Sequence, residues 1–230
     1  MLVSVVVPAY NEVGYIDKLL RSLRAQTVPC EIVVCDNNST DGTARVAKRY
    51  ADKVVHEPRR GIAHSFNAAC RAASGDLIAM TGADCLVPED WIERFLPFFE
   101  DDRIIACYGP VHSTCRSYRR TFKFFSYFYK VIVKLKIAWG VSDANLIIRK
   151  SILDKVGYFD TEVQMMEDSM LMRKIRKYGK LKFLSDNIVK TSPRRLEKEG
   201  AKKVFIDRTV SLIKMKLLHR VGDEKFEAVR

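Results

Sequence analysis

The sequence predicts an α/β domain with a mostly parallel central sheet and helices on both of its faces. Short apolar runs typical of strands alternate along the chain with segments whose apolar residues have helical spacing. In the first such unit, strand-like runs at 3–7 and 31–35 flank a segment carrying Ile16, Leu19 and Leu23. Strands that alternate with helices form parallel sheets, whose ligand crevice lies at the carboxyl ends of the strands.

The alternation continues through the rest of the chain. After a turn and capping cluster at 37–42, Val46, Ala47 and Tyr50 mark a second helix. Further strands are predicted at 53–55, 77–80, 104–108, 145–148 and 180–184, and further helices at 62–73, 91–99, 167–178 and 196–219. We expect one domain over 1–195 and a basic helical extension at 196–230.

Composition limits the class of protein. With 230 residues and 47% hydrophobic residues, the chain can bury a substantial core. Its six cysteines form no Cys-x-x-Cys pair and mostly lie beside apolar runs, as free buried thiols in a reducing compartment do. The first apolar run lacks a basic leader and stops at Pro8, and no run reaches about 18 apolar residues. We therefore expect a cytoplasmic protein, with peripheral contact to the cytoplasmic membrane face left open.

The charge of the chain is strongly positive. Lys and Arg number 40 against 28 Asp and Glu, which gives a formal net charge of +12. Such a balance favours an anionic partner: nucleic acid, an anionic membrane, or a phosphorylated small molecule. Charge alone does not choose among these.

Polar residues follow each of the first four predicted strands. Asn11 and Glu12 follow the first, Asp36 the second, Glu57 the third and Asp84 the fourth. Each alone suits a turn or a helix start, and for Asp84 the helix predicted to open at 88–90 is such an alternative. Together they indicate a site at one edge of the sheet.

Five segments in order resemble the family 2 glycosyltransferases, which have the nucleotide-sugar-binding GT-A fold. They read VSVVVPAYNE, VVCDNNSTDGT, EPRRGIAHSFNAA, SGDLIAMTGADC and GYFDTEVQMMEDSMLMRKIRKYG. The resemblance covers roughly 2–195, with donor-side motifs in 1–110 and acceptor-side motifs in 140–195. It implies transfer of a sugar from a UDP- or GDP-linked donor to an acceptor.

The resemblance assigns donor contacts to the first half of the chain. Pro8, Tyr10 and Glu12 would bind the nucleotide sugar, with Tyr10 against the base. Asp36 would accept hydrogen bonds from the ring N–H of uracil or guanine, because an ionised carboxylate only accepts. Arg60 would reach the base or the diphosphate through its guanidinium fork. The alternatives are core packing for Tyr10, a turn cap for Asp36 and a solvated side chain for Arg60.

The resemblance also implies a divalent cation, Mg²⁺ or Mn²⁺. The family usually has Asp-x-Asp after the fourth strand, but here Gly82 replaces the first acid and Asp84 alone remains as the metal ligand. One carboxylate with donor phosphates and water can hold such an ion. Arg194 and Arg195 would stabilise the leaving diphosphate. Their alternative is a solvated helix start.

On the acceptor side, the resemblance assigns Asp168 as the general base that takes the proton of an acceptor hydroxyl, with Glu167 as a second candidate. A base opposite the leaving nucleotide implies inversion at the anomeric carbon. The alternative is a helix whose first turn carries acids that favour its dipole.

Residues 117–139 are basic and aromatic and contain no acid. At helical spacing, Lys123, Lys130 and Lys134 fall on one face, which suits a helix lying on an anionic membrane and a lipid-phosphate acceptor. The lysine-rich segment 202–216 suits the same partner. A core helix with a solvated lysine edge is the alternative, and a sugar or protein acceptor also remains open.

Three rival functions differ in what they explain. A nucleic-acid-binding module fits the charge but not the acids at the strand ends, so we expect no nucleic acid partner. A nucleotidyltransferase typically needs a glycine-rich basic loop after the first strand, where this chain has PAYNEVGY. A nucleotide-sugar-binding module without catalysis is suggested by Gly82 alone.

Overall fold

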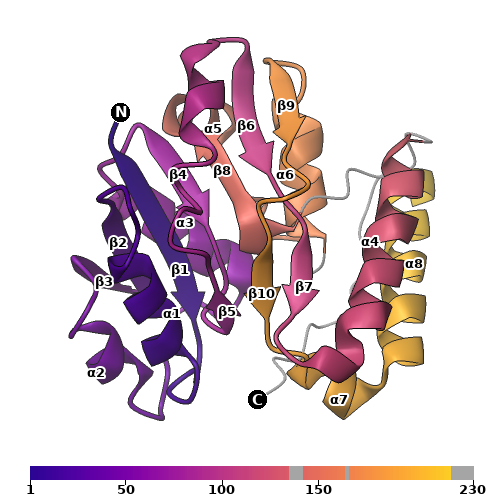
Figure 1. Ribbon diagram of the computed structural model, residues 1–230, viewed down its shortest axis with the longest axis horizontal. Coiled ribbons are helices and arrows are strands. Elements are labelled where there is room, and N and C mark those ends of the chain that lie inside the picture. The colour runs from indigo at the N-terminus through magenta and orange to yellow at the C-terminus, as the bar shows by residue number, and fades with distance from the viewer. Residues whose placement is uncertain (135–141, 164–165, 219–230) are drawn as a thin grey trace.

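A computed structural model describes residues 1–134, 142–163 and 166–218. Its centre is a seven-stranded sheet in the order β3 (Lys53–His56), β2 (Glu31–Asp36), β1 (Val3–Ala9), β4 (Leu77–Met80), β8 (Leu146–Arg149), β6 (Ile104–Tyr108) and β9 (Lys180–Phe183). All neighbouring strands are parallel except β8, which runs antiparallel to β4 and β6. The mostly parallel sheet predicted from the sequence is confirmed (Figure 1).

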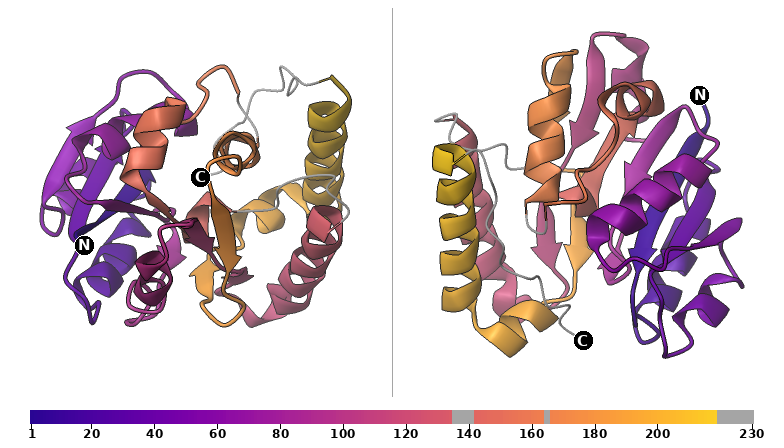
Figure 2. Two further views of the ribbon diagram at one scale, coloured as in Figure 1. Left: turned by 90° about the horizontal axis from the view of Figure 1, so that it is seen from above. Right: turned by 180° about the vertical axis from the view of Figure 1, so that it is seen from behind.

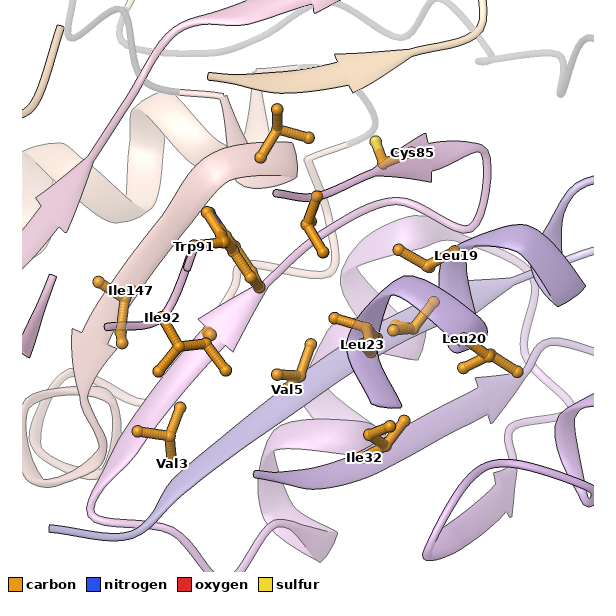
Figure 3. Packing of buried hydrophobic residues seen from close by; sticks show 14 of the residues in the cluster. Val3, Val5, Leu19, Leu20, Leu23, Ile32, Cys85, Trp91, Ile92 and Ile147 are labelled. Carbon is orange, nitrogen blue, oxygen red and sulfur yellow. The ribbon is translucent and has the colours of Figure 1, made fainter. Parts of the chain in front are cut away.

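Helices cover both faces of this sheet. One face carries α1 (Ile16–Arg24) and α2 (Thr43–Ala47), and the other carries α3 (Ile62–Ala72), α5 (Lys150–Val156) and α6 (Glu167–Ile175). Successive side chains of a strand point to opposite faces. Val3 and Val5 of β1 accordingly belong to the cluster that includes Leu19 and Leu23 of α1, with Val5 next to Leu23 and Val3 next to Ile92 (Figure 3), whereas Val6 belongs to the cluster on the α3 face.

A small second sheet was not predicted. It consists of β5 (Cys85–Leu86), β10 (Val189–Thr191) and β7 (Val111–Ser113). Fully buried Asn145 joins it to the main core. The Asn145 side chain accepts a hydrogen bond from Trp91 Nε1 at 2.8 Å and donates to the backbone oxygens of Pro110 at 3.0 Å and Asn187 at 2.7 Å.

The α-helix predicted at 91–99 is wrong. The chain forms turns there, followed by the 3₁₀ helix η1 (Leu96–Glu100). Pro97 stands inside this segment, and a proline lacks the backbone N–H that an α-helix interior needs. The apolar residues of the stripe are nevertheless buried, among them Trp91, Phe95 and Phe99. No α-helix begins at 88–90 either, where the chain makes a turn.

The single long helix predicted at 196–219 is two helices, α7 (Arg194–Glu199) and α8 (Ala201–Leu218). Gly200 separates them with a φ of +82°, a backbone conformation that glycine adopts readily and other residues rarely do. Helix α8 lies beside α4 (Arg119–Lys134), and the pair stands apart from the central sheet (Figures 1 and 2). The Phe205 ring contacts Phe124 and Phe128, with centroids 5.7 and 4.8 Å away.

Two further 3₁₀ turns, η2 (Arg116–Tyr118) and η3 (Asp143–Asn145), flank α4 and β8. Within the three described ranges, no helix has both the length and the apolar character that a membrane crossing requires. The boundary between a domain at 1–195 and an extension at 196–230 stays a prediction. Part of the basic aromatic segment, 135–139, lies outside the described residues.

Candidate functional site

The carboxyl ends of β1 and β2 meet at Asp36. Ala9 and Asp36 are register partners, which places Tyr10 next to the end of β2. The Asp36 side chain is only 9% exposed, and its Oδ1 has no hydrogen-bond partner among the described residues. Its other oxygen, Oδ2, accepts from the Ser39 backbone N–H at 3.4 Å and lies 3.7 Å from His56 Nδ1. A buried acceptor without a partner is costly and fits a ligand that supplies an N–H.

Arg60 lies over the Tyr10 ring, with its Cζ 3.6 Å from the ring centroid. The loop that carries it is held by Asn37, whose side chain donates to the Arg59 backbone oxygen at 2.7 Å and accepts from the Gly61 N–H at 3.0 Å. Asn37 was not singled out from the sequence, although it stands in the turn that follows Asp36. Its bonds hold the loop of Arg60 beside the turn after Asp36, and Arg60 in turn lies over Tyr10.

Glu57, also at a strand end, has a structural partner. Arg59 donates to it from Nε at 2.9 Å and from its backbone N–H at 3.0 Å. These bonds to Arg59 lower the pKa of Glu57 to about 2. Glu57 therefore shapes the loop before Arg60.

A second group of residues forms around Arg194. Its Nη1 donates to Glu12 Oε2 at 2.7 Å, its Nη2 donates to Glu12 Oε1, and its Nε lies 3.4 Å from Asp84 Oδ2. The Arg194 Cζ lies 4.8 Å from the centroid of the Tyr15 ring. Thr191 of β10 donates its hydroxyl to Asp84 Oδ1 at 3.2 Å. Three of the predicted residues, Glu12, Asp84 and Arg194, are thus in direct contact, and Tyr15 and Thr191 are additions that the sequence did not indicate.

Burial and charge act in opposite directions in this group. Burial is the largest influence on the pKa of Glu12 and, together with the charges of Asp84 and Asp41, raises it against the opposing effect of Arg194. Burial alone would lower the pKa of Arg194, but its bond to Glu12 and the charge of Asp84 outweigh this and raise it. The guanidinium is therefore a fixed cation between two carboxylates.

The oxygen atoms around Asp84 are suitable ligands for a hard divalent cation. Asp84 and Glu12 offer carboxylate oxygens and Thr191 a hydroxyl, the ligand type that Mg²⁺ and Mn²⁺ prefer. In the described part of the chain, no group of three or more His, Cys, Asp or Glu is placed to hold a metal. Gly82 adds no ligand, and a Cβ there would lie 3.3 Å from Asp84 Oδ1. The protein would thus supply few ligands, with the rest left to donor phosphates and water.

The remaining predicted residues lie in three places. Pro8 is in β1, paired in register with Cys35. Arg195 donates to Glu199 at 3.1 Å within α7, so it does not share the Arg194 fork. Glu167 and Asp168 are half-buried in the first turn of α6, where they were predicted to open a helix. Their role on the acceptor side stays a prediction.

The segment before α6 is fixed to α3 by a reciprocal pair of bonds. Asn67 donates to the Phe159 backbone oxygen at 2.9 Å and accepts from the Phe159 N–H at 2.9 Å. The Phe66 and Phe159 rings stack at 5.1 Å. Helix α3 therefore connects the loop of Arg60, at its start, to the segment that leads toward Asp168.

Relatives of known sequence include named glycosyltransferases. The chain is 24% identical over 214 residues to the glycosyltransferase AglE of Haloferax volcanii, covering 88% of this chain and 70% of that one. It is 35% identical over 122 residues to the chondroitin synthase of Pasteurella multocida, covering 50% of this chain but 12% of that much longer one.

Solved structures share the fold. The mannosyltransferase PcManGT of Pyrobaculum calidifontis, in complex with GDP-Man and Mn²⁺, matches with a TM-score of 0.73 and 25% identity, covering 98% of this chain and 65% of that chain. Glucosyl-3-phosphoglycerate synthase of Mycobacterium tuberculosis matches with a TM-score of 0.69 and 16% identity, covering 97% and 81%. This chain thus spans about two thirds of the mannosyltransferase. The family described as Glycosyl transferase family 2 matches residues 4–157, and the chain belongs to that family.

Proposed function

We propose that this protein is an inverting, metal-assisted glycosyltransferase that moves a sugar from a nucleoside-diphosphate sugar to an acceptor hydroxyl or lipid phosphate. The observation that carries the proposal is the buried Asp36 Oδ1, which lacks a partner among the described residues beside Tyr10 and Arg60. A ring N–H of uracil or guanine would satisfy this oxygen, and the base would stack on the guanidinium plane. The mannosyltransferase matched above was solved with GDP-Man, which supports a nucleotide-sugar donor.

The leaving group is a nucleoside diphosphate, which gains negative charge as the bond to the sugar breaks. Fixed positive charge near it lowers the barrier, because it needs no rearrangement during the reaction. Arg194 supplies such a charge beside Asp84, and Arg195 on the same helix is a further candidate. A divalent cation held by Asp84 would add Lewis-acid stabilisation of the phosphate oxygens.

On the other side of the sugar, an acceptor hydroxyl must lose a proton as it attacks. Asp168 is assigned as the general base and Glu167 as the alternative, both in the first turn of α6. Attack opposite the leaving diphosphate in one displacement inverts the anomeric carbon.

A thermal-shift screen tests the donor class. Nucleoside diphosphates and UDP- and GDP-sugars are added with and without Mn²⁺, because a ligand that binds only the folded state raises its melting temperature. We expect one nucleotide class to stabilise the protein, and more so with Mn²⁺. Turnover with that donor and NMR of the product's anomeric proton then test transfer and inversion. Absence of any nucleotide effect would contradict the proposal.

A membrane-bound acceptor is supported by the helix pair α4 and α8. Phe124, Tyr127, Ile206 and Val210 are exposed large hydrophobic residues on these two helices. Exposed basic residues accompany them: Arg119, Arg120, Lys123, Lys202 and Lys203. Apolar residues among lysines and arginines are typical of helices that lie on anionic lipid. We propose that this pair contacts the cytoplasmic membrane face and brings the active site to a lipid-phosphate acceptor.

Vesicle sedimentation tests this contact. The protein should pellet with phosphatidylglycerol-containing vesicles and not with phosphatidylcholine alone, and added salt should release it. The double substitution Lys123→Glu and Lys203→Glu should abolish pelleting. Equal binding by parent and double variant would exclude this surface.

Gly82 favours one second candidate, a nucleotide-sugar-binding module without catalysis. Its lack of a side chain removes the acid that usually accompanies Asp84 in the family. Donor binding without transfer to any sugar, protein or lipid-phosphate acceptor would support that module. A nucleotidyltransferase is less favoured, since the loop after β1 contains no glycine-rich phosphate-binding sequence.

A further inference from the structure

The Arg194 guanidinium lies beside Asp84, at the carboxylate that we propose as the metal ligand. Its Nε lies 3.4 Å from Asp84 Oδ2 while its two terminal nitrogens contact Glu12. The side chains of Arg194, Glu12 and Asp84 are only 19%, 12% and 18% exposed. Two largely buried carboxylates without a cation would be strongly destabilising. In the protein without a bound nucleotide-sugar donor, the Arg194 guanidinium supplies the positive charge that these two carboxylates require.

The backbone holds Arg194 close to Asp84. The Ser192 N–H donates to the Asp84 backbone oxygen at 3.2 Å, and the Ser192 hydroxyl accepts from the Arg194 N–H at 3.3 Å. The guanidinium also lies 4.8 Å from the Tyr15 ring centroid, a cation–π contact. Arg194 is therefore positioned by several independent contacts, and the long side chain alone has to move if another cation approaches Asp84.

We infer that Arg194 and the divalent cation compete for Asp84. This rests on the proposed metal-assisted function. When the metal ion binds Asp84, Arg194 loses the weaker of its two contacts, the one from Nε to Asp84. Its two bonds to Glu12 remain and keep the guanidinium beside the donor's diphosphate. Competition makes the protein a weak metal binder by itself. A donor diphosphate adds negative charge that both cations can share, so donor and metal would bind together.

The competition is tested by Mn²⁺ titration of the donor-free protein, with free Mn²⁺ followed by electron paramagnetic resonance. Arg194→Met removes the cation and keeps an apolar stem against Tyr15. We expect Mn²⁺ to bind this variant on the order of tenfold more tightly than the parent, a change of about 1.4 kcal/mol. Arg94→Met is the matched control, because Arg94 is an ion-paired arginine bonded to Asp90 and has no assigned role at the site. Its Mn²⁺ affinity should stay within about twofold of the parent, which measures the effect of charge removal as such.

A second variant guards against a folding defect. Arg194→Lys keeps the charge but cannot form the two-pronged contact, so its Mn²⁺ affinity should lie between parent and Arg194→Met. If Arg194→Met does not fold, Arg194→Lys decides alone, and equal affinity in it and the parent overturns the competition. Equal affinity in folded Arg194→Met and the parent overturns it too.

The outcomes separate this inference from the proposed function. If the parent shows Mn²⁺-dependent donor binding but removal of Arg194 does not tighten Mn²⁺, the competition is wrong and metal assistance stands. If no variant binds Mn²⁺ and transfer proceeds in a chelator, both the competition and metal assistance are wrong, while glycosyl transfer stands.

Discussion

The guanidinium of Arg60 stacks on the ring of Tyr10, with its Cζ 3.6 Å from the ring centroid. Tyr10 follows β1 and Arg60 follows β3, one of the two edge strands of the sheet, so the pair spans the ends of three neighbouring strands. Asp36, at the end of the strand between them, points an acceptor into a buried position. The three residues thus offer a base both a flat cationic surface and a hydrogen-bond acceptor.

Arg60→Ala should weaken donor binding. Loss of stacking on a guanidinium is worth about 0.5–2 kcal/mol, which corresponds to a roughly 2- to 30-fold higher dissociation constant. Isothermal titration with the nucleotide found in the screen measures it. Arg21→Ala is the control, because Arg21 pairs with Asp17 on α1 and its side chain is 66% exposed. Unchanged or tighter binding by Arg60→Ala would mean that Arg60 covers the place of the base instead of lining it.

Asp84→Ala should abolish the Mn²⁺-dependent part of donor binding. The reason is that Asp84 offers a carboxylate to the ion and Gly82 offers none. Donor affinity is compared with Mn²⁺ and with a chelator, in the variant and in the parent. Asp90→Ala, at a partly buried aspartate paired with Arg94, controls for loss of a negative charge. Equal metal enhancement in Asp84→Ala and the parent would remove Asp84 from the site.

The sequence predicted the central sheet well because its signals are local. Each of β1, β2 and β4 contains a continuous apolar run, and the helices between them show their buried face within a few turns. The small sheet lacks such a signal. Thr191 of β10 pairs with Cys85 of β5, and strands of two or three residues show no periodicity of their own.

The candidate site divides in the same way. Asp36 and Asp84 were predicted because acids at the ends of apolar runs stand out along the sequence. The fork between Arg194 and Glu12 joins residues 182 positions apart, so its partners cannot be paired from the sequence. Asn37 and Thr191 are residue types common in turns and strands, so only the folded structure shows that they contact the loop of Arg60 and Asp84, respectively.

Glu31 should make stability depend on pH. Burial alone would raise the pKa of Glu31, but hydrogen bonds from Lys53, Ser4 and Ser74 outweigh it and lower the pKa to about 2. Because the folded pKa lies below the ordinary 4.5, this carboxylate stabilises the fold fully above about pH 4.5. The contribution falls as the pH drops toward 2 and is absent below that.

Urea unfolding of the parent and Glu31→Gln between pH 7 and pH 2 measures this contribution. The difference in unfolding free energy should be largest at neutral pH and shrink from about pH 4.5 downward. Glu100→Gln, at an exposed position, accounts for the general effect of removing one negative charge. A difference between parent and Glu31→Gln that is constant with pH would show that Glu31 acts through packing and not through its charge.

Asp168→Asn should impair the chemical step and leave donor binding intact. A general base removes the proton only as the acceptor attacks, so kcat and kcat/KM should fall together, on the order of 10²- to 10⁴-fold. Asparagine keeps the shape of the side chain in the first turn of α6, which limits any folding defect. Steady-state rates with a verified acceptor, and titration of the donor, give the two readouts.

Glu167→Gln is the companion variant at the adjacent position. If Asp168→Asn keeps near-parental turnover while Glu167→Gln loses it, Glu167 is the base. If Asp168→Asn loses donor affinity instead, the division into a donor side and an acceptor side is wrong.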